Sequence, residues 1–285
     1  YRSLGLAPEP DPQGSFAMPY AAFLCHRRDN WLACVKGQSR YVWSSERQAR
    51  RNAYGLFLGL GNLEILAGGD PVTARASGRS GAGWDWRRFE GVTAPLLPPA
   101  ELDAGWPAVS GTLRSPERFA GGLSHQGRQG LFGMRLHLAI QPKPSVLRGR
   151  KSWFFEENRI VCLGSELSYD DPRHPVQTTL CQKALHADES GAFPPTLLDG
   201  AAFDPVPGER PLDPGRAHWF LDLQRTGYYV PSGQAVTLAR RFQKSRDVDD
   251  ARDTEGHFLT AWIDHGKAPS GAGYEYALLI RTSPG

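Results

Sequence analysis

The sequence predicts an all-β fold, a large antiparallel β-sandwich with long loops, from three observations. Its apolar runs are short, of strand length, and rich in aromatic and β-branched residues. Glycine (32 residues) and proline (23 residues) are abundant, which favours many tight turns over long helices. Heptads and longer internal repeats are absent from the sequence. Short strands that follow one another closely must pair and bury one face, so a single sandwich is the most economical architecture.

In the first half, apolar runs alternate with polar clusters. Residues 23–25, 31–35 and 41–43 predict consecutive antiparallel strands. Residues 44–54 are polar and basic with little periodicity, which predicts a loop facing solvent or a cleft. Residues 55–66 alternate again and predict a further strand or two.

The second half begins after two connections rich in glycine or proline, at residues 67–83 and 95–111. Residues 156–159 predict a tight turn that joins two strands into a hairpin. The strands predicted in this half are 130–140, 151–155, 159–163, 176–182, 218–223, 227–230, 258–263 and 274–281.

Composition and charge exclude several classes of protein. Apolar residues make up 40% and charged residues 22% of the chain, which excludes wholesale disorder. The net charge of +3 creates no global field towards nucleic acid or lipid, so we expect neither as a partner. No apolar stretch is long enough to span a membrane. Because the N-terminus has neither an initiator methionine nor an apolar signal core, we expect the chain to be a piece of a longer protein.

The cysteines and histidines predict neither a metal site nor a cofactor. Cys25, Cys34, Cys162 and Cys181 lack zinc spacing, and the histidines are dispersed along the chain. Buried small side chains are the default role of these cysteines. Cys25 and Cys34 flank a polar segment and could face each other across a hairpin, so a disulfide and two free thiols both remain open there. We also assign no nucleophile.

Local clusters of arginine point to an acidic ligand. They lie at residues 26–28, at Arg40, at residues 47–51 and at residues 87–88. The planar guanidinium suits bidentate capture of carboxylate or sulfate, and interleaved tryptophan and tyrosine suit stacking on sugar rings. An acidic polysaccharide fits both features, whereas the simpler interpretation is a solvated basic surface.

A second aromatic and basic cluster, residues 84–91, lies between the two flexible connections. Bulky amphipathic side chains in a loop need something to pack on, which is either a ligand or the protein itself. Trp84 and Trp86 are the best candidates for sugar-binding rings, with Arg87 beside them, and a structural plug of the fold is the alternative.

Short strings along nearly the whole chain resemble the polysaccharide lyase family that includes chondroitin ABC, chondroitin AC, hyaluronate and xanthan lyases. They occur in the family's order, and the first and last are most similar to the chondroitin ABC type. The strings are FAMPY (16–20), HRRDNW (26–31), VWSSE (42–46), GWDW (83–86), GVT (91–93), KSWF (151–154), NRIVCLGS (158–165), VQTT (176–179), TGYY (226–229), TEG (254–256), AWIDH (261–265) and YEY (274–276).

The resemblance implies a domain organisation and a reaction. Family enzymes have an N-terminal α/α toroid, a central β-sandwich of the supersandwich, galactose-mutarotase-like kind, and usually a smaller C-terminal β domain. Residues 1–285 would then be the central sandwich alone, with the catalytic tyrosine and histidine on the helical domain. The implied reaction is β-elimination next to a uronic acid, which requires neutralising the carboxylate, removing the C5 proton and protonating the leaving oxygen.

The resemblance also assigns residues. An active-site arginine of the chondroitin ABC type maps onto Arg28, with Arg27 as the alternative, and Arg40 is expected to border the cleft. Gln129 is the nearest residue to the position where the family is expected to have a glutamate. Gln177 similarly stands where an acidic residue is often seen.

The sequence therefore predicts a secreted or periplasmic lyase of a uronic-acid-containing glycosaminoglycan, similar to chondroitin sulfate or hyaluronan. Its expected partners are the acidic polysaccharide and the helical domain of the same enzyme. The alternative is a carbohydrate-binding β-sandwich module without catalytic activity.

Overall fold

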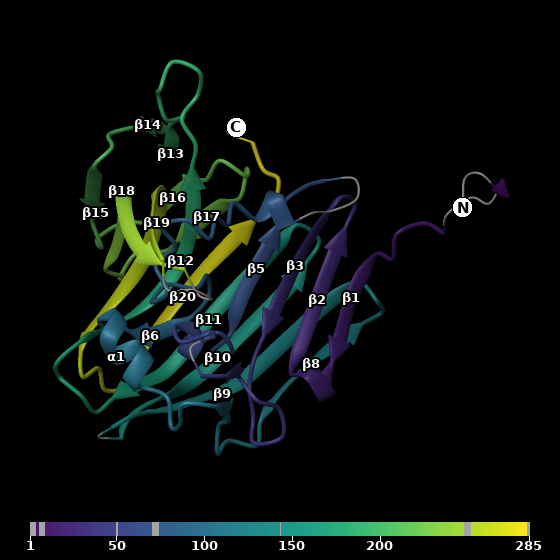
Figure 1. The fold of residues 1–285 in the computed structure, drawn as a ribbon. Coiled ribbons are helices and arrows are strands. Elements are labelled where there is room, and N and C mark those ends of the chain that lie inside the picture. The colour runs from purple at the N-terminus through teal and green to yellow at the C-terminus, as the bar shows by residue number, and fades with distance from the viewer. Residues whose placement is uncertain are drawn as a thin grey trace.

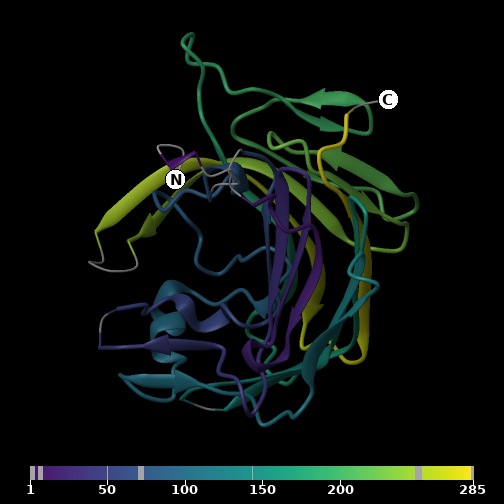
Figure 2. The ribbon, with the colours of Figure 1, turned by 90° about the vertical axis from the view of Figure 1, so that its right-hand side faces the viewer.

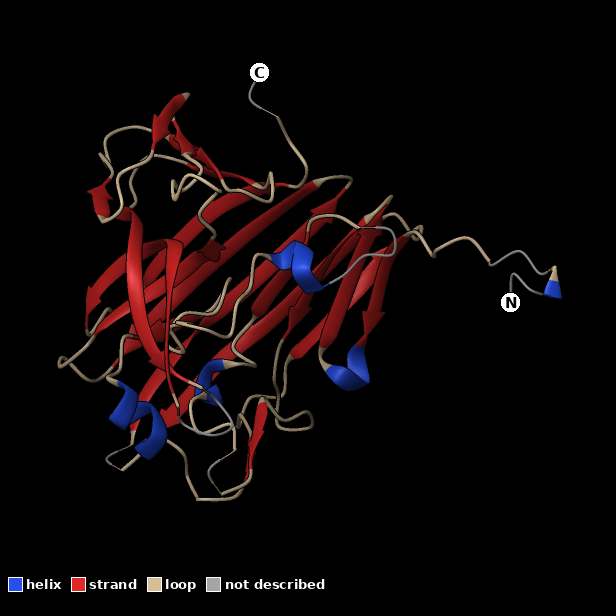
Figure 3. Cartoon of the chain, turned by 45° about the horizontal axis from the view of Figure 1, so that its top comes forward, coloured by secondary structure: helices blue, strands red, loops and turns tan. Residues whose placement is uncertain are grey.

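Strands are the predominant secondary structure of the computed structural model, which describes residues 4–5, 9–49, 51–69, 74–142, 144–247 and 252–283. Within these residues the strands form four antiparallel sheets (Figure 1). Helical structure is confined to a few short segments (Figure 3). The predicted all-β sandwich is therefore confirmed.

The element bounds follow the chain order. The strands are β1 (Gly14–Met18), β2 (Phe23–Arg28), β3 (Trp31–Lys36), β4 (Ser45–Arg47), β5 (Asn62–Leu66), β6 (Thr93–Pro95), β7 (Gly111–Leu113), β8 (Ala120–His125), β9 (Gln129–Ile140), β10 (Ser145–Glu156), β11 (Arg159–Tyr169), β12 (Pro175–Leu185), β13 (Thr196–Leu198), β14 (Ala201–Phe203), β15 (Gly208–Pro211), β16 (His218–Leu221), β17 (Gly227–Val230), β18 (Val236–Arg246), β19 (Asp253–Lys267) and β20 (Ala272–Leu279). The helices are α1 (Pro99–Ala104) and the 3₁₀ turns η2 (Pro19–Ala21), η3 (Gly55–Phe57) and η4 (Ala74–Ser77).

Two layers build the sandwich (Figure 2). One is the nine-stranded sheet β14-β13-β16-β17-β20-β11-β10-β9-β8. The other combines the four-stranded sheet β1-β2-β3-β5 with the five-stranded sheet β15-β18-β19-β12-β6. The segment before β6 joins these two sheets, because the Leu63 N–H donates to the Glu90 carbonyl and the Gly91 N–H donates to the Thr179 carbonyl, both at 2.8 Å. A fourth sheet is the small β4–β7 ribbon.

The core lies between the layers. Strand alternation directs Phe132 of β9 and Trp153 of β10 inward, where both are completely buried against residues such as Leu24 and Val35. Gly61 allows the closest approach: its φ is +86°, and a Cβ there would overlap the Trp153 ring. Burial of this continuous apolar surface is the main stabilising contribution.

Strands β2 and β3 form a tight hairpin around Asp29, whose φ is positive at 45°. The Gly37 N–H donates to the Ala22 carbonyl at 2.8 Å, so these two residues form a hydrogen-bonded pair. Hydrogen-bonded and non-hydrogen-bonded pairs then alternate along the antiparallel hairpin. Cys25 and Cys34 are directly opposite in a non-hydrogen-bonded pair. Both are free thiols, and their sulfurs lie 3.1 Å apart.

Strand β18 has one partly free edge. Strand β15 pairs with Thr237–Arg240 only, so no described strand pairs with that edge over residues 241–246.

The prediction of a strand at residues 41–43 was wrong. The Ser39 hydroxyl accepts hydrogen bonds from the backbone N–H groups of Tyr41 and Val42, both at 3.2 Å, which folds this segment into a turn. The loop predicted at 44–54 instead contains β4, and β18 was not predicted at all. In the connection predicted at 67–83, residues 70–73 lie outside the described residues. No helix among the described residues is long and apolar enough to cross a membrane.

Candidate functional site

Two aromatic side chains are exposed on the loop that follows β3. The Ser39 turn and a bond of 2.7 Å from the Arg40 N–H to the Glu117 carbonyl hold this loop against the segment between β7 and β8. As a result, Tyr41 is 67% exposed and Trp43 is 47% exposed. Large aromatic side chains left in solvent by a fixed loop are candidates for ligand contacts.

A guanidinium lies over each of these rings. The Arg40 guanidinium is 5.5 Å from the centre of the Tyr41 ring, and the Arg114 guanidinium is 5.5 Å from the centre of the Trp43 ring. Such pairs combine an apolar face, which suits the C–H face of a sugar, with a cation, which suits a carboxylate or sulfate. We call Arg40, Tyr41, Trp43 and Arg114 the aromatic platform.

An exposed carboxylate follows the platform on strand β4. Glu46 is paired with Thr112 of β7, and its side chain is exposed. The Gln48 amide donates to the Glu46 carboxylate at 3.4 Å, and the Asn52 amide donates to the Glu46 backbone carbonyl at 2.6 Å. A carboxylate in this position can accept sugar hydroxyl bonds or take part in proton transfer.

Strand β4 is tied to helix α1, which borders a depression of about 270 Å³. The Arg47 guanidinium donates to the Asp103 carbonyl at 2.8 Å and forms an ion pair with the Asp103 carboxylate at 2.6 Å. We call the depression the β18 pocket, because the free edge of β18 forms one wall. Its lining consists of Tyr54, Asp85, Trp86, Arg87, Pro99, Leu102, Arg241, Phe242, Gln243, Lys244 and Ser245.

The β18 pocket carries more positive than negative charge. Arg87 forms a bidentate pair with Asp85 at 2.7 and 2.8 Å. Burial would raise the pKa of Asp85, but Arg87 and Arg88 lower it overall. Burial lowers the pKa of Arg241, whose guanidinium lies 5.3 Å above the Trp262 ring. With Lys244 there are three cations and one carboxylate in the lining, which favours an anionic ligand.

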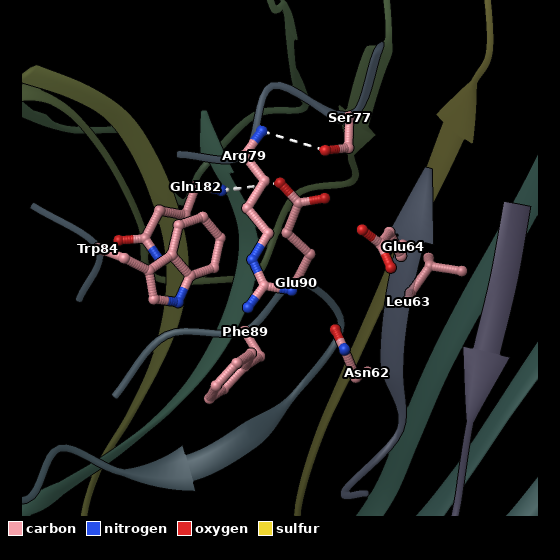
Figure 4. Close-up of a pocket in the computed structure, with 9 residues that line it drawn as sticks. All are labelled: Asn62, Leu63, Glu64, Ser77, Arg79, Trp84, Phe89, Glu90 and Gln182. Atoms are coloured by element: carbon pink, nitrogen blue, oxygen red, sulfur yellow. Dashed lines mark hydrogen bonds between the residues drawn. The ribbon is translucent and has the colours of Figure 1, made fainter. Parts of the chain in front are cut away.

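Trp84 and Trp86, predicted as sugar-binding rings, are both buried. Trp84 lines, together with Glu90 and Gln182, a cavity of about 20 Å³, which is large enough for a single water (Figure 4). The Trp86 indole N–H donates to the Arg246 carbonyl at 2.7 Å. Their burial corresponds to the structural plug of the fold, although Trp86 also lines the β18 pocket. A role of either ring in substrate binding stays a prediction.

The predicted catalytic residues Arg27, Arg28 and Gln129 lie at the other end of β2 and β3 from Arg40. Strand β3 has six residues, which puts roughly 17 Å between these ends. Arg27 is paired with Asp11, and Arg28 donates to the Arg128 carbonyl.

The surroundings of this end are carboxylate-rich. The Arg28 guanidinium lies 3.6 Å from Glu157, and the Gln129 amide donates to Glu156 at 3.3 Å. The structure thus brings Arg28 and Gln129 into one region but separates them from Arg40. Their catalytic role stays a prediction.

Gln177 has a structural reason to be uncharged. Its amide oxygen accepts from Arg88 at 2.7 Å and its amide nitrogen donates to Asp264 at 2.8 Å. A carboxylate at this buried position would face Asp264 with like charge. Gln177 therefore bridges a cation and an anion inside the sandwich.

Sequence reasoning did not single out Tyr41, Trp43, Glu46, Arg241 or Lys244 as site residues. Tyr41 directly precedes the string VWSSE, which contains Trp43 and Glu46. The signal in the sequence was therefore Ser39, a residue type that favours turns, followed by two aromatic residues and a carboxylate. In the part of the chain that the structure describes, no three His, Cys, Asp or Glu side chains are grouped in a way that could hold a metal ion.

Comparison with known proteins identifies the family. Residues 16–284 match polysaccharide lyase family 8, super-sandwich domain. The chondroitin sulfate ABC exolyase of Bacteroides thetaiotaomicron is 37% identical over 98% of this chain and 26% of the relative, and that of Proteus vulgaris is 35% identical over 97% and 28%. The solved structure of Streptomyces coelicolor A3 chondroitin AC lyase in complex with chondroitin sulphate has a TM-score of 0.74 at 25% identity, covering 97% of this chain and 34% of that one.

The chain spans little more than a quarter of the length of these curated relatives. The family match, in contrast, covers nearly all of the chain. The chain therefore belongs to polysaccharide lyase family 8, with residues 16–284 matching its super-sandwich domain.

Proposed function

We propose that the protein is part of a lyase that cleaves a uronic-acid-containing glycosaminoglycan, similar to chondroitin sulfate, by β-elimination. This chain supplies the β-sandwich wall of the substrate cleft. The observation that carries the proposal is the aromatic platform, in which Arg40 and Arg114 lie over the exposed rings of Tyr41 and Trp43. Family membership gives the reaction class, and the names of the relatives support the substrate class.

The chemistry explains why cations and aromatic rings belong together here. The C5 proton of a uronic acid becomes removable when the neighbouring carboxylate is neutralised and the developing negative charge is stabilised. In this proposal Arg40 and Arg114 neutralise that carboxylate while Tyr41 and Trp43 hold the sugar ring. Glu46 then accepts hydroxyl hydrogen bonds or assists proton transfer next to them. Arg87, Arg241 and Lys244 provide a second anion-binding position in the β18 pocket.

The remaining groups belong to a second domain in this proposal. The tyrosine and histidine that move protons lie on an N-terminal helical domain, with which residues 1–285 form the cleft as the central sandwich. We further propose a secreted or periplasmic location, where the extracellular polymer is accessible. The length of the relatives, which is almost four times that of this chain, supports additional domains.

An elimination assay tests the proposal. The longer polypeptide that includes the helical domain should release unsaturated uronate from chondroitin sulfate, measured by its ultraviolet absorbance. Trp43→Ala should raise KM by about tenfold or more, since the ring binds ground state and transition state alike. Glu46→Gln should lower kcat by about 10²-fold or more if the carboxylate takes part in proton transfer.

Two matched variants separate the alternative sites. Arg40→Ala should lower kcat/KM by about 10²-fold because the carboxylate loses a charged partner. If Arg28 is the catalytic arginine instead, Arg28→Ala gives the larger loss of kcat and Arg40→Ala leaves it unchanged. Binding of the polymer without any release of unsaturated product would favour the non-catalytic carbohydrate-binding module.

A further inference from the structure

A block of basic residues lies on the outer face of the nine-stranded sheet. Outward positions of β9 and β10 pair Arg135 directly with Arg150 and His137 directly with Arg148. The side chains at the alternate positions, such as Met134 and Lys151, are buried in the core. The sheet therefore holds four basic side chains in two adjacent rows on its solvent side.

Such an arrangement is unfavourable in the free protein. The like charges of Arg135 and Arg150 lie directly opposite on neighbouring strands and repel each other. Arg135 has a partner carboxylate, Glu117, at 3.8 Å, and Arg150 has Glu166 at 3.1 Å. Among the described residues, Arg148 has no carboxylate within ion-pair distance.

The positive charge of Arg148 also affects the pKa of the neighbouring His137. Burial and the nearby Arg148 lower the pKa of His137, with Glu117 opposing. Charges facing this imidazole thus include an arginine from β10 and a carboxylate from the segment before β8. The positive potential persists despite the two glutamates.

The surface around these basic residues also contains depressions. Two adjoining depressions of about 560 and 380 Å³ share Glu117, Arg135 and Arg148. Phe119, which is 59% exposed, forms an apolar wall beside Arg118. We call these two depressions together the β9–β10 groove. It offers four arginines against two glutamates, with an aromatic ring at one side.

The groove is connected to the aromatic platform by one chain segment. Arg114 of this segment lies over Trp43, and the Glu117 carbonyl accepts the Arg40 N–H. Directly after Glu117, Arg118 and Phe119 line the groove. A polymer bound at the platform can therefore continue along this segment onto the outer face of the sheet.

We propose that the β9–β10 groove is a second binding site for the acidic polysaccharide, which holds sulfate and carboxylate groups of a long chain outside the cleft. The proposal rests on the function proposed above. Sulfate and uronate match guanidinium forks, and Phe119 supplies an apolar contact for a sugar ring. Short oligosaccharides that fill the platform alone do not reach the groove.

Binding by this 285-residue chain tests the groove. The double variant Arg135→Gln/Arg148→Gln should bind polymeric chondroitin sulfate at least about tenfold more weakly by calorimetry, while its affinity for a tetrasaccharide stays unchanged. The difference should shrink as salt is added. The melting temperature should change little, because both arginines are exposed and the exposed Arg135–Glu117 ion pair contributes little to stability.

The matched control is Arg159→Gln. Arg159 is an exposed arginine of the same sheet with one carboxylate partner, Glu156, at 3.3 Å. Unchanged polymer affinity in the double variant, an equal loss in the Arg159→Gln control, or equally tight binding of duplex DNA would each overturn the groove as a polysaccharide site. Failure of the proposed function appears separately, as absence of unsaturated product from the longer polypeptide, and leaves this binding measurement valid.

Discussion

Lys151 is a fully buried lysine that is held by backbone carbonyls. Its ammonium group donates to the carbonyls of Leu60, at 3.0 Å, and Gly91 and lies 5.2 Å from the centre of the Trp153 ring. No carboxylate within the described residues forms an ion pair with it. Burial therefore lowers the pKa of Lys151 from 10.5 to about 7.

This lysine should make the stability of the sandwich depend on pH. Between pH 7 and pH 10 the unfolded chain binds the proton and the folded chain does not, so stability rises with pH across this window. The contribution between pH 7 and pH 9 is of order 2 kcal/mol. Urea unfolding of the parent and of Lys151→Met at both pH values measures it. We expect the variant to lose this slope, and parallel pH profiles would contradict the assignment.

Aromatic residues show what the sequence could and could not predict at this scale. A role as sugar contacts was predicted for Trp84 and Trp86, yet these are buried, whereas Tyr41 and Trp43 are exposed. Exposure depends on which segments pack over a loop, and local composition does not contain that information. The arginine clusters were visible in the sequence, but Arg28 and Arg40 proved to lie at opposite ends of one hairpin.

At the scale of elements, strands with clear alternation were predictable and β18 was not. Its sequence VTLARRFQKSR has arginine at an inward position, because Arg240 is completely buried. The Arg240 guanidinium donates to the carbonyls of Phe203, at 2.7 Å, and Pro194, at 2.6 Å, which replaces its lost hydration. A buried arginine whose guanidinium is hydrogen-bonded therefore interrupts the apolar alternation in the sequence but does not interrupt the strand.

The β2–β3 hairpin should form a disulfide when oxidised. Cys25 and Cys34 occupy a non-hydrogen-bonded pair, whose Cα spacing suits a disulfide. The hydrogen bond from Cys34 lowers the pKa of Cys25, with burial opposing. Oxidised glutathione should form one bond between the two sulfurs and release two glutathione thiols. The intact protein then loses two hydrogen masses in mass spectrometry.

Two variants control this experiment. Cys25→Ser should form no bridge and carry at most one mixed disulfide, on Cys34, while Cys162→Ser should still form the bridge, because Cys162 is buried in the core. Recovery of glutathione adducts on both Cys25 and Cys34 without a bridge would show that the hairpin cannot close the bond.

At the scale of the whole molecule, one core should make the sandwich unfold as a unit. Trp153 lies at its centre, fully buried, with its ring 5.8 Å from that of Phe132. Trp153→Ala should destabilise the chain by about 3–5 kcal/mol through lost burial and a cavity. Urea unfolding followed by circular dichroism measures the loss. Hydrogen exchange of β3 and β18 should accelerate together, and a change confined to one of them would indicate two independent units.

The fold of this chain was predictable from local alternation and turns, because each strand must bury one face. The complete site was not. The aromatic platform depends on contacts between segments some 70 residues apart, such as Arg40 with Glu117 and Trp43 with Arg114. The proton-moving groups of the proposed reaction lie, in our proposal, on a domain outside these 285 residues.

The partly free edge of β18 also bears on how separate molecules behave in solution. An open run of backbone donors and acceptors invites a strand from a neighbouring copy, which is a common route to aggregation. Here the indole of Trp86 covers the Arg246 carbonyl, and Arg241, Lys244 and Arg246 place positive charge along the run. Two such edges repel each other. The same cations that favour an anionic sugar in the β18 pocket thus protect the protein from self-association at high concentration.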